Sequence, residues 1–336
     1  MQRTSVYLTR GLISHLYNIM TISPDLGKPY LYEQESVDRF IISHYSHIRQ
    51  GKKKTESGVF AMLNRKICFV GAGAMAEALI GGLIAQGKVT PEKIAVVNKT
   101  NLARLEDLAA KYGVQVGPEK KGELIRQADI LILAVKPKDV KTVLEEIRPL
   151  IHERQLVISV VAGLPISAIS KLLGKEVKVI RTMPNTSALV GLSATALSIG
   201  SRVDEKDLDV ARAIFQSVGE VYLVKEEEMD IITGLAGSGP AYVYYLVEAM
   251  IKGGIDGGLD ENLAYKLALQ TVLGAAKMLT KTGENPALLR QKVTSPNGTT
   301  ARGIATLEKY HFEEAVRQCI LEAAKRSKEL SKEWES

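Results

Sequence analysis

Between residues 66 and 224, short apolar segments alternate with amphipathic ones, and this alternation constrains the fold more than any other feature. The expected strands are residues 66–70, 94–97, 130–134, 156–160, 177–181, 193–199 and 220–224. Helical patterns at residues 75–86, 101–112, 137–150 and 204–217 separate several of them. Apolar strands that alternate with amphipathic helices are typical of a parallel sheet covered on both faces. The sequence therefore predicts an α/β fold with a doubly wound sheet.

After Val224 the strand signal disappears and helical periodicity takes over. Apolar residues recur at helical spacing over residues 226–258, 260–281 and 311–333, with shorter stretches at 286–293 and 299–308. Ala, Leu, Met and Lys dominate there, and all four favour helices. We therefore expect an α/β domain over residues 62–224 and an all-helical domain over residues 225–336.

Residues 1–61 lack a clear apolar periodicity and are interpreted as an extension of uncertain status, with disorder as one interpretation. Residues 1–24 contain Arg3 and Arg10 and no acid, as a targeting peptide would. The acidic residues that follow, Glu33, Glu35 and Asp38, are not typical of such a peptide. This favours a dispensable or artefactual extension.

Charge and cysteine content exclude several classes of protein. The formal net charge is +6, but the basic residues are spread among acids, which gives nucleic-acid binding little support. The longest apolar runs, such as "ILILAV" from Ile130, are far shorter than the roughly 18 residues that a membrane helix needs. The two cysteines form no CxxC or Cys/His cluster, so no metal site is expected. We expect a cytoplasmic protein whose partners are a small-molecule substrate and copies of itself.

The sequence "GAGAMA" directly follows the first expected strand and opens a helix. Gly71 permits the tight turn, Gly73 lets the backbone approach a pyrophosphate, and the small Ala76 lets helix pack on strand. The helix N-terminus offers free N–H groups to the phosphates. Although glycine turns of this kind also serve packing alone, the strand–turn–helix context predicts a dinucleotide-binding domain of the Rossmann type.

The end of the second expected strand indicates which dinucleotide binds. An enzyme that uses NAD commonly carries Asp or Glu there, whereas this chain has Asn98, Lys99 and Thr100. A lysine and two neutral donors suit a 2′-phosphate, so NADPH is expected, with NADH as the alternative. The other interpretation of Lys99 is an exposed turn residue without a ligand. The turns at residues 134–137 and 160–163 close two further strands and are expected to line the same groove.

Two segments of the helical part are candidates for binding an anionic substrate. Residues 234–245 place glycines and Pro240 before a long helix, and residues 293–303 place a Pro-Asn-Gly turn before another. Successive N–H groups at such a start suit a carboxylate, although ordinary capped helices look the same. After residue 61 only His152 and His311 remain, and neither is expected to act as a general acid. The reaction should therefore need little proton transfer from the protein.

Seven segments together resemble the pyrroline-5-carboxylate reductase family over about residues 63–333. They are "FVGAGAMAEALIGGL", "LAVKPKDV", "VVAGLPIS", "RTMPNTSALVG", "GLAGSGPAYVY", "QTVLGAAKML" and "VTSPNGTTARGIATLE". The resemblance implies NAD(P)H-dependent reduction of the C=N bond of 1-pyrroline-5-carboxylate to L-proline, the final step of proline biosynthesis. It also implies a helical domain that dimerises by interleaving, with dimers assembling into larger oligomers such as a decamer.

The resemblance also implies roles for individual residues. Ser295, Gly298, Thr299 and Thr300, together with Asn297 in the same turn, would hold the substrate, with Ser295 and Thr300 as the catalytic pair. The residues expected to bind the cofactor are Val70, Gly71, Ala72, Gly73, Ala74, Met75, Asn98, Lys99, Ala134, Val135, Lys136, Pro137, Val160, Val161 and Ala162.

Three positions depart from the family pattern. Asn297 stands where glycine is common, Ser187 where proline is common, and Lys121 where many members carry asparagine. Asn tolerates a left-handed backbone, so the turn at Asn297 can survive. None of the three departures removes a hydroxyl or glycine to which the resemblance assigns chemistry.

Two rival hypotheses belong to other classes. A 3-hydroxyacid dehydrogenase would share the plan of the fold, but the lysine and asparagine that it needs are missing from "GLAGSGPAYVYY". An NADPH-binding paralogue could act on another imine or keto acid, or serve as a non-catalytic sensor. The intact hydroxyls at residues 295–300 argue against the sensor.

Overall fold

The computed structural model describes residues 63–174 and 176–334. The segment interpreted as an extension, residues 1–61, lies outside the described residues.

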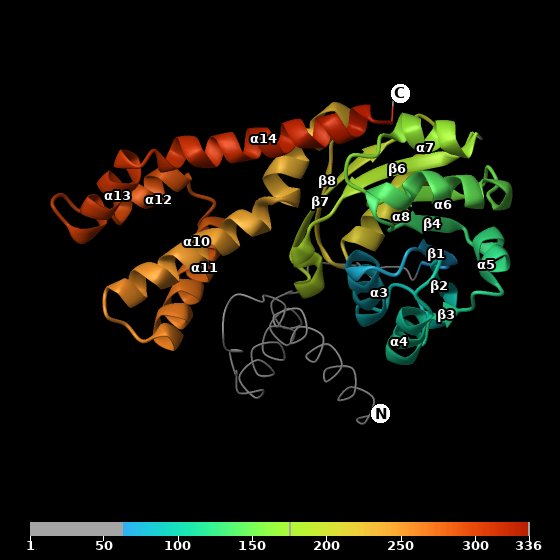
Figure 1. The fold of residues 1–336 in the computed structure, drawn as a ribbon, viewed down its shortest axis with the longest axis horizontal. Helices are drawn as coiled ribbons and strands as arrows, with labels where there is room; N and C mark the ends of the chain where they lie inside the picture. Colours follow the sequence, from blue (N-terminus) through green and yellow to red (C-terminus); the bar gives the residue numbers. More distant parts are fainter. Residues whose placement is uncertain (1–62, 175, 335–336) are drawn as a thin grey trace.

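An eight-stranded sheet forms the centre of the described N-terminal part (Figure 1). The strands are β1 (Ile67–Val70), β2 (Ile94–Val97), β3 (Gln115–Val116), β4 (Ile130–Leu133), β5 (Leu156–Ser159), β6 (Lys178–Met183), β7 (Ser193–Ile199) and β8 (Gly219–Leu223). Their order is β3-β2-β1-β4-β5-β6-β7-β8. Each expected strand is present, and the two-residue β3 is an addition.

The sheet is not wholly parallel, because β7 runs antiparallel to β6. Only nine residues connect the two strands, and they contain the short helix η4 (Thr186–Val190). A parallel crossover needs about a dozen residues or more. The sheet therefore has the expected parallel arrangement except at this one pairing.

Helices cover both faces of the sheet. The helices are α3 (Ala74–Ala85), α4 (Leu102–Tyr112), α5 (Lys121–Gln127), α6 (Val140–Ile147), α7 (Ile166–Leu173) and α8 (Glu205–Phe215), with short 3₁₀ turns η1 (Pro91–Lys93), η2 (Pro137–Asp139) and η3 (Arg148–Leu150). Neighbouring residues of β1 point to opposite faces, so Phe69 packs in one buried cluster and Cys68 in the other. Leu79 and Phe215 belong to the first cluster, and Leu144 belongs to the second. This is the doubly wound, Rossmann-like arrangement that the sequence predicts.

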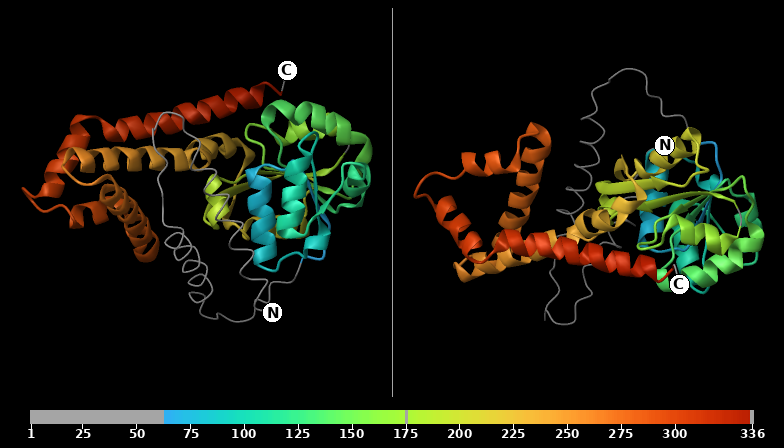
Figure 2. Two further views of the ribbon diagram at one scale, coloured as in Figure 1. Left: turned by 60° about the horizontal axis from the view of Figure 1, so that its bottom comes forward. Right: turned by 90° about the horizontal axis from the view of Figure 1, so that it is seen from above.

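The C-terminal part consists of helices joined by short turns, with no strand among its described residues. It consists of η5 (Glu226–Glu228), α9 (Met229–Ile232), the π-helical turn η6 (Thr233–Gly237), α10 (Gly239–Asp256), α11 (Glu261–Thr282), α12 (Pro286–Lys292), α13 (Thr299–Lys309) and α14 (Phe312–Lys332). Helix α10 leads away from the sheet and α14 returns to it (Figures 1 and 2). Asp260 caps α11 by accepting hydrogen bonds from the N–H groups of Asn262 and Leu263.

The helices of this part expose many large apolar side chains. Tyr245 and Tyr310 are each 73% exposed, and Val293 is 66% exposed. Apolar exposure over several neighbouring helices is typical of a surface that another protein chain covers. Of the helices that the structure describes, none combines the length and apolar character that crossing a membrane requires.

Candidate active site

The loops that follow β1, β2, β4 and β5 meet at one edge of the sheet. These four strands are parallel and adjacent, so their carboxyl ends lie together. Backbone hydrogen bonds tie the first residues of the loops to neighbouring strands: Gly71 N to Val97 O at 2.8 Å, and Ala134 N to Val70 O at 2.9 Å. The order of the strands reverses direction between β1 and β4, and ligands of such sheets bind at this switch point.

The glycine-rich loop lies directly at the switch point. Gly71 has φ +113°, and a β-carbon on it would lie 2.3 Å from the carbonyl oxygen of Ala134. Gly73 is the N-cap of α3, and none of the described side chains caps this helix end. The first N–H groups of α3 are therefore available to a ligand, and a pyrophosphate is the anion that such a loop suits best.

Asn98, at the end of β2, has an orphaned acceptor. Its Nδ2 donates to the carbonyl oxygen of Asn101 at 2.7 Å, which fixes the orientation of the amide. Its Oδ1 is buried and has no hydrogen-bond partner among the described residues. A buried acceptor without a donor costs free energy, and a ribose hydroxyl is a donor of the required kind. Lys99 and Thr100 beside it are exposed. The residues at this edge therefore fit a dinucleotide.

The other expected cofactor residues lie along the same edge. Ala134 and Val135 are half-buried, while Lys136 and Pro137 are exposed, and Pro137 opens the 3₁₀ turn η2. After β5, Val160 and Ala162 are half-buried and Val161 is buried. The half-buried and exposed members leave a ligand access to the edge of the sheet.

A buried ion-pair network that the sequence analysis missed supports the glycine-rich loop. Arg104 of α4 donates from Nε to the carbonyl oxygen of Ala72 at 3.1 Å and also pairs with Glu77. Glu77, in the first turn of α3, also accepts from Lys111 at 2.7 Å and from the Tyr112 hydroxyl at 3.1 Å. Burial alone would raise the pKa of Glu77, but hydrogen bonds from Lys111 and Arg104 outweigh it and lower the pKa to about 2. A lone acid inside the apolar run "AMAEALIGGL" was the available signal.

The turn at residues 295–300 forms an exposed helix start. Asn297 has φ +61°, the left-handed conformation that the sequence analysis allowed for it. Gly298 N donates to Ser295 O at 3.0 Å, and Gly298 is the N-cap of α13. None of the described side chains caps the N-terminus of this helix. The hydroxyl-bearing residues Ser295, Thr299 and Thr300 are exposed beside these N–H groups.

The structure does not bring this turn to the sheet edge within one chain. Helices α12 and α13 lie at the end of the helical part that is farthest from the sheet (Figures 1 and 2). The expected substrate residues and the expected cofactor residues therefore form two separate groups on a single chain.

The second candidate for an anion-binding helix start, residues 234–245, continues a helix instead. The N–H of Ser238 donates to Thr233 O at 2.9 Å through the π-helical turn, and Ala241 N donates to Ser238 O at 3.0 Å. Because α9, η6 and α10 form one nearly continuous helical path, this segment is not the free helix start on which the anion-cradle interpretation depends. The expectation that Pro240 lies in the first turn of a helix is confirmed.

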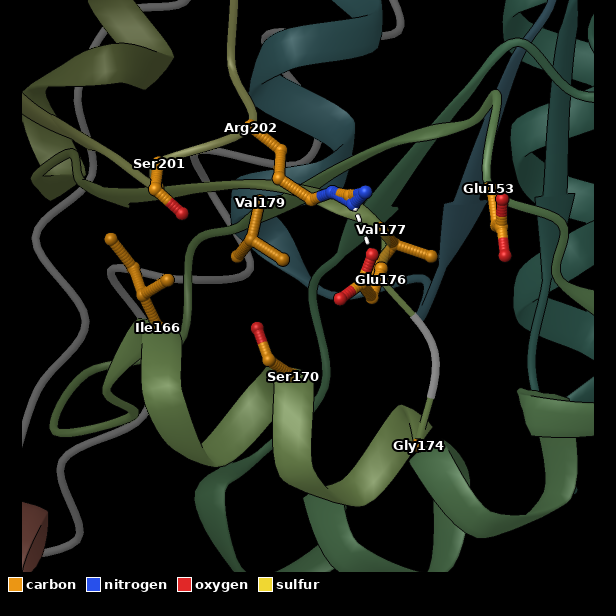
Figure 3. A pocket seen from close by; sticks show the side chains of 10 residues that line it. Glu153, Ile166, Ser170, Gly174, Glu176, Val177, Val179, Ser201 and Arg202 are labelled. Carbon is orange, nitrogen blue, oxygen red and sulfur yellow. Dashed lines mark hydrogen bonds and ion pairs between the residues drawn. The ribbon is translucent and has the colours of Figure 1, made fainter.

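A hollow of about 560 Å³ lies elsewhere, beside α7 (Figure 3). Its lining includes Ser170 of α7, Val177 at the amino end of β6, and Arg202, which pairs with Glu176. The amino ends of the parallel strands lie at the opposite edge from the four loops. None of the expected site residues lines this hollow, so it is separate from the candidate site.

Two family descriptions match the two parts of the chain. The family described as "NADP oxidoreductase coenzyme F420-dependent" matches residues 66–163. The family described as "Pyrroline-5-carboxylate reductase dimerisation" matches residues 226–330.

Relatives and solved structures match most of the chain. Pyrroline-5-carboxylate reductase 1 of Bacillus subtilis is 45% identical over 284 residues, which are 84% of this chain and 95% of the relative. A pyrroline-5-carboxylate reductase structure from Coxiella burnetii has a TM-score of 0.74 at 38% identity and covers 80% of this chain and 98% of its own. The Plasmodium falciparum pyrroline carboxylate reductase, solved with NADP bound, has a TM-score of 0.72 at 32% identity, over 81% of this chain and 100% of its own.

Proposed function

This chain belongs to the pyrroline-5-carboxylate reductase family, and we propose that it performs the family's reaction at the sheet edge described above. It reduces the C=N bond of 1-pyrroline-5-carboxylate to L-proline, the final step of proline biosynthesis, with hydride from NAD(P)H. The observation that carries the proposal is the uncapped N-terminus of α3 behind Gly71 and Gly73, at the switch point of the sheet.

The cofactor-binding part of the proposal assigns the sheet edge to NADPH, with NADH as the alternative. The N–H groups at the start of α3 bind the pyrophosphate, and the orphaned Oδ1 of Asn98 accepts a hydrogen bond from the adenosine ribose. The exposed Lys99 beside it binds the 2′-phosphate in this proposal. Residues 160–162 line the nicotinamide end. When bound, NADPH supplies the hydride.

The substrate-binding part assigns the carboxylate of the substrate to the N-terminus of α13. The N–H groups of Thr299 and Thr300 and the hydroxyl of Ser295 hold the carboxylate, and the Thr300 hydroxyl binds the ring nitrogen in this proposal. A protonated cyclic imine is already a good hydride acceptor, so the protein chiefly has to position it. This explains why the reaction needs no catalytic histidine.

A second copy of the chain completes each site in this proposal. The turn at residues 295–300 lies far from the sheet of its own chain, and exposed apolar side chains cover the helices between them. An interleaved partner that covers those side chains brings its own turn to the sheet edge. In functional terms residues 62–224 are the cofactor domain and residues 225–336 the substrate and dimerisation domain. We further propose that dimers assemble into a larger oligomer such as a decamer, and that the protein acts in the cytoplasm.

The loss of NADPH absorbance in the presence of 1-pyrroline-5-carboxylate tests the function. The assay compares the full chain with a chain that starts at Met62. Turnover to proline in both supports the reductase and a dispensable extension. A protein that binds NADPH but does not turn over the substrate contradicts the proposal and favours a paralogue for another imine or keto acid, or a sensor.

A further inference from the structure

The loop after β5, residues 160–165, is held in place by the helical part of the chain. Gly163 has φ +69°, and a β-carbon on it would lie 2.9 Å from Cβ of Leu330 in α14. At the end of the loop, the N–H of Ile166 donates to Oε1 of Glu226 at 2.8 Å. The loop therefore touches both the first residues and the last helix of the helical part.

A buried guanidinium, that of Arg181, connects the two parts of the chain that contact this loop. Arg181 lies on β6 directly opposite Ser159, the last residue of β5, and its side chain is only 5% exposed. Its Nη1 lies 3.5 Å from Oε1 of Glu226, and its Nη2 lies 3.5 Å from Oδ1 of Asp230. A buried charge needs such partners, because removing one of them leaves the charge uncompensated in the protein interior.

Asp230 connects the guanidinium to α14. Its Oδ1 accepts from the hydroxyl of Ser327 at 2.7 Å and from that of Ser331 at 3.4 Å. Both serines are buried, and they lie close to Leu330 in the last turns of α14. The carboxylate of Asp230 thus serves both α14, through the two serines, and Arg181, through the ion pair.

We propose that Arg181, Glu226, Asp230 and Ser327, the Arg181 cluster, are positioning residues for hydride transfer. The cluster holds the loop at residues 160–165 against α14 and so sets the position of the surface that receives the nicotinamide. This inference rests on the proposed function, which assigns residues 160–162 to the nicotinamide end.

The position of the Arg181 cluster implies that it affects the binding of only the nicotinamide half of the dinucleotide. The adenosine end lies over β2, where the Glu77 and Arg104 network supports the backbone of the glycine-rich loop. The Arg181 cluster lies beyond β5, at the other end of the expected cofactor-binding edge. Disturbing it should therefore weaken contacts to the nicotinamide and leave contacts to the adenosine half intact.

The test compares the dissociation constants of NADPH and of 2′-phospho-ADP-ribose, which lacks the nicotinamide. For Asp230→Ala we expect the Kd of NADPH to rise about tenfold and that of the fragment to stay within about twofold, because the loss of one charge-assisted contact in a buried cluster is worth about one decade. Asp230→Asn keeps the acceptor for Ser327 and should restore part of the NADPH affinity. Ser327→Ala is a milder variant that perturbs the same contact from α14.

Lys178→Met is the matched control. Lys178 lies on the same strand as Arg181 and also pairs with two acids, Asp204 at 3.1 Å and Asp207 at 2.6 Å, but at the opposite edge of the sheet. The Lys178→Met substitution should leave the dissociation constants of NADPH and of the fragment unchanged. Trp334, the single tryptophan of the chain, packs against a buried cluster of the sheet just after α14. Its fluorescence emission therefore reports whether the end of α14 stays packed against the sheet in each variant.

The outcomes separate the inference from the proposed function. Selective loss of NADPH affinity in Asp230→Ala and Ser327→Ala, with partial recovery in Asp230→Asn, supports the inference. An equal loss for both ligands, or unchanged binding despite shifted Trp334 emission, overturns it and leaves a structural role. A wild-type protein that neither binds NADPH nor reduces the substrate overturns the proposed function itself.

Discussion

Gly71 and Ala134 approach so closely that a β-carbon on Gly71 would lie 2.3 Å from the carbonyl oxygen of Ala134. The loops after β1 and β4 thus meet backbone to backbone, with no room for a side chain between them. Gly71 also has φ +113°, where other residues are strained. Two independent physical reasons therefore require glycine at this position.

Replacing the two glycines of the loop should have different consequences. Gly71→Ala should lower the free energy of unfolding by about 3 kcal/mol, through backbone strain and the clash with Ala134. Gly73→Ala should leave stability nearly unchanged, because a β-carbon there lies 3.9 Å from its nearest neighbour, yet weaken NADPH binding by crowding the pyrophosphate. Denaturant unfolding and NADPH titration of both variants measure this. Equal stability of the two variants would contradict the close approach.

The buried carboxylate of Glu77 should make stability depend on acidic pH. Its pKa is about 2 in the folded protein against the ordinary 4.5, so its stabilising effect is complete above pH 4.5 and is lost as the pH falls through 2. Glu77→Gln should lower the free energy of unfolding at neutral pH by about 3 kcal/mol and flatten its decline between pH 4.5 and 2. Urea unfolding at a series of pH values measures both effects. A variant whose stability falls with acid as steeply as the wild type would argue against the network.

Thr300→Ala should reduce turnover far more than it affects NADPH binding. Its hydroxyl lies at the exposed start of α13, where the proposal places the ring nitrogen of the substrate. We expect kcat/KM to fall by about tenfold or more, with the Kd of NADPH within about twofold of wild type. Thr306→Ala is the control, because Thr306 lies on the same helix and its hydroxyl donates to the backbone carbonyl of Arg302. Lost cofactor binding with intact turnover would refute the role of Thr300.

Two impaired variants should partly restore activity when they are co-expressed. Gly73→Val damages the cofactor half of a site, and Thr300→Ala damages the substrate half. If each site takes one half from each chain, a mixed dimer holds one intact site, so random mixing should give about a quarter of wild-type activity. Each variant purified alone sets the baseline. No recovery above that baseline would mean that one chain supplies the whole site.

The strands and the glycine-rich loop could be predicted because their signals are local. An apolar segment such as "ILILA" needs no knowledge of its neighbours, and Gly71 and Gly73 follow their strand directly. The two-residue β3 is too short to form a pattern, and α5 buries only Ile125, so it has no periodicity to detect. The direction of β7 depends on the length of its connection to β6 and not on its composition.

The supporting clusters could not be predicted because their members lie far apart in the sequence. Arg181 of β6, Asp230 of α9 and Ser327 of α14 meet only after the sheet and two separate helices have assembled. The available hint was a charged residue at the end of an apolar strand, since a buried arginine must find acidic partners. That hint marks Arg181 but does not identify its partners.

The return of α14 to the sheet bears on how the protein is made. Leu330 and Ser327 contact the loop around Gly163, yet the ribosome adds them long after that loop has been synthesised. During synthesis, Arg181 and this loop therefore lack their contacts with α14 until that helix has been made. The local stability of a region depends on the contacts that it has already made. The loop at residues 160–165 should therefore be the last part of the α/β domain to become resistant to proteolysis during synthesis.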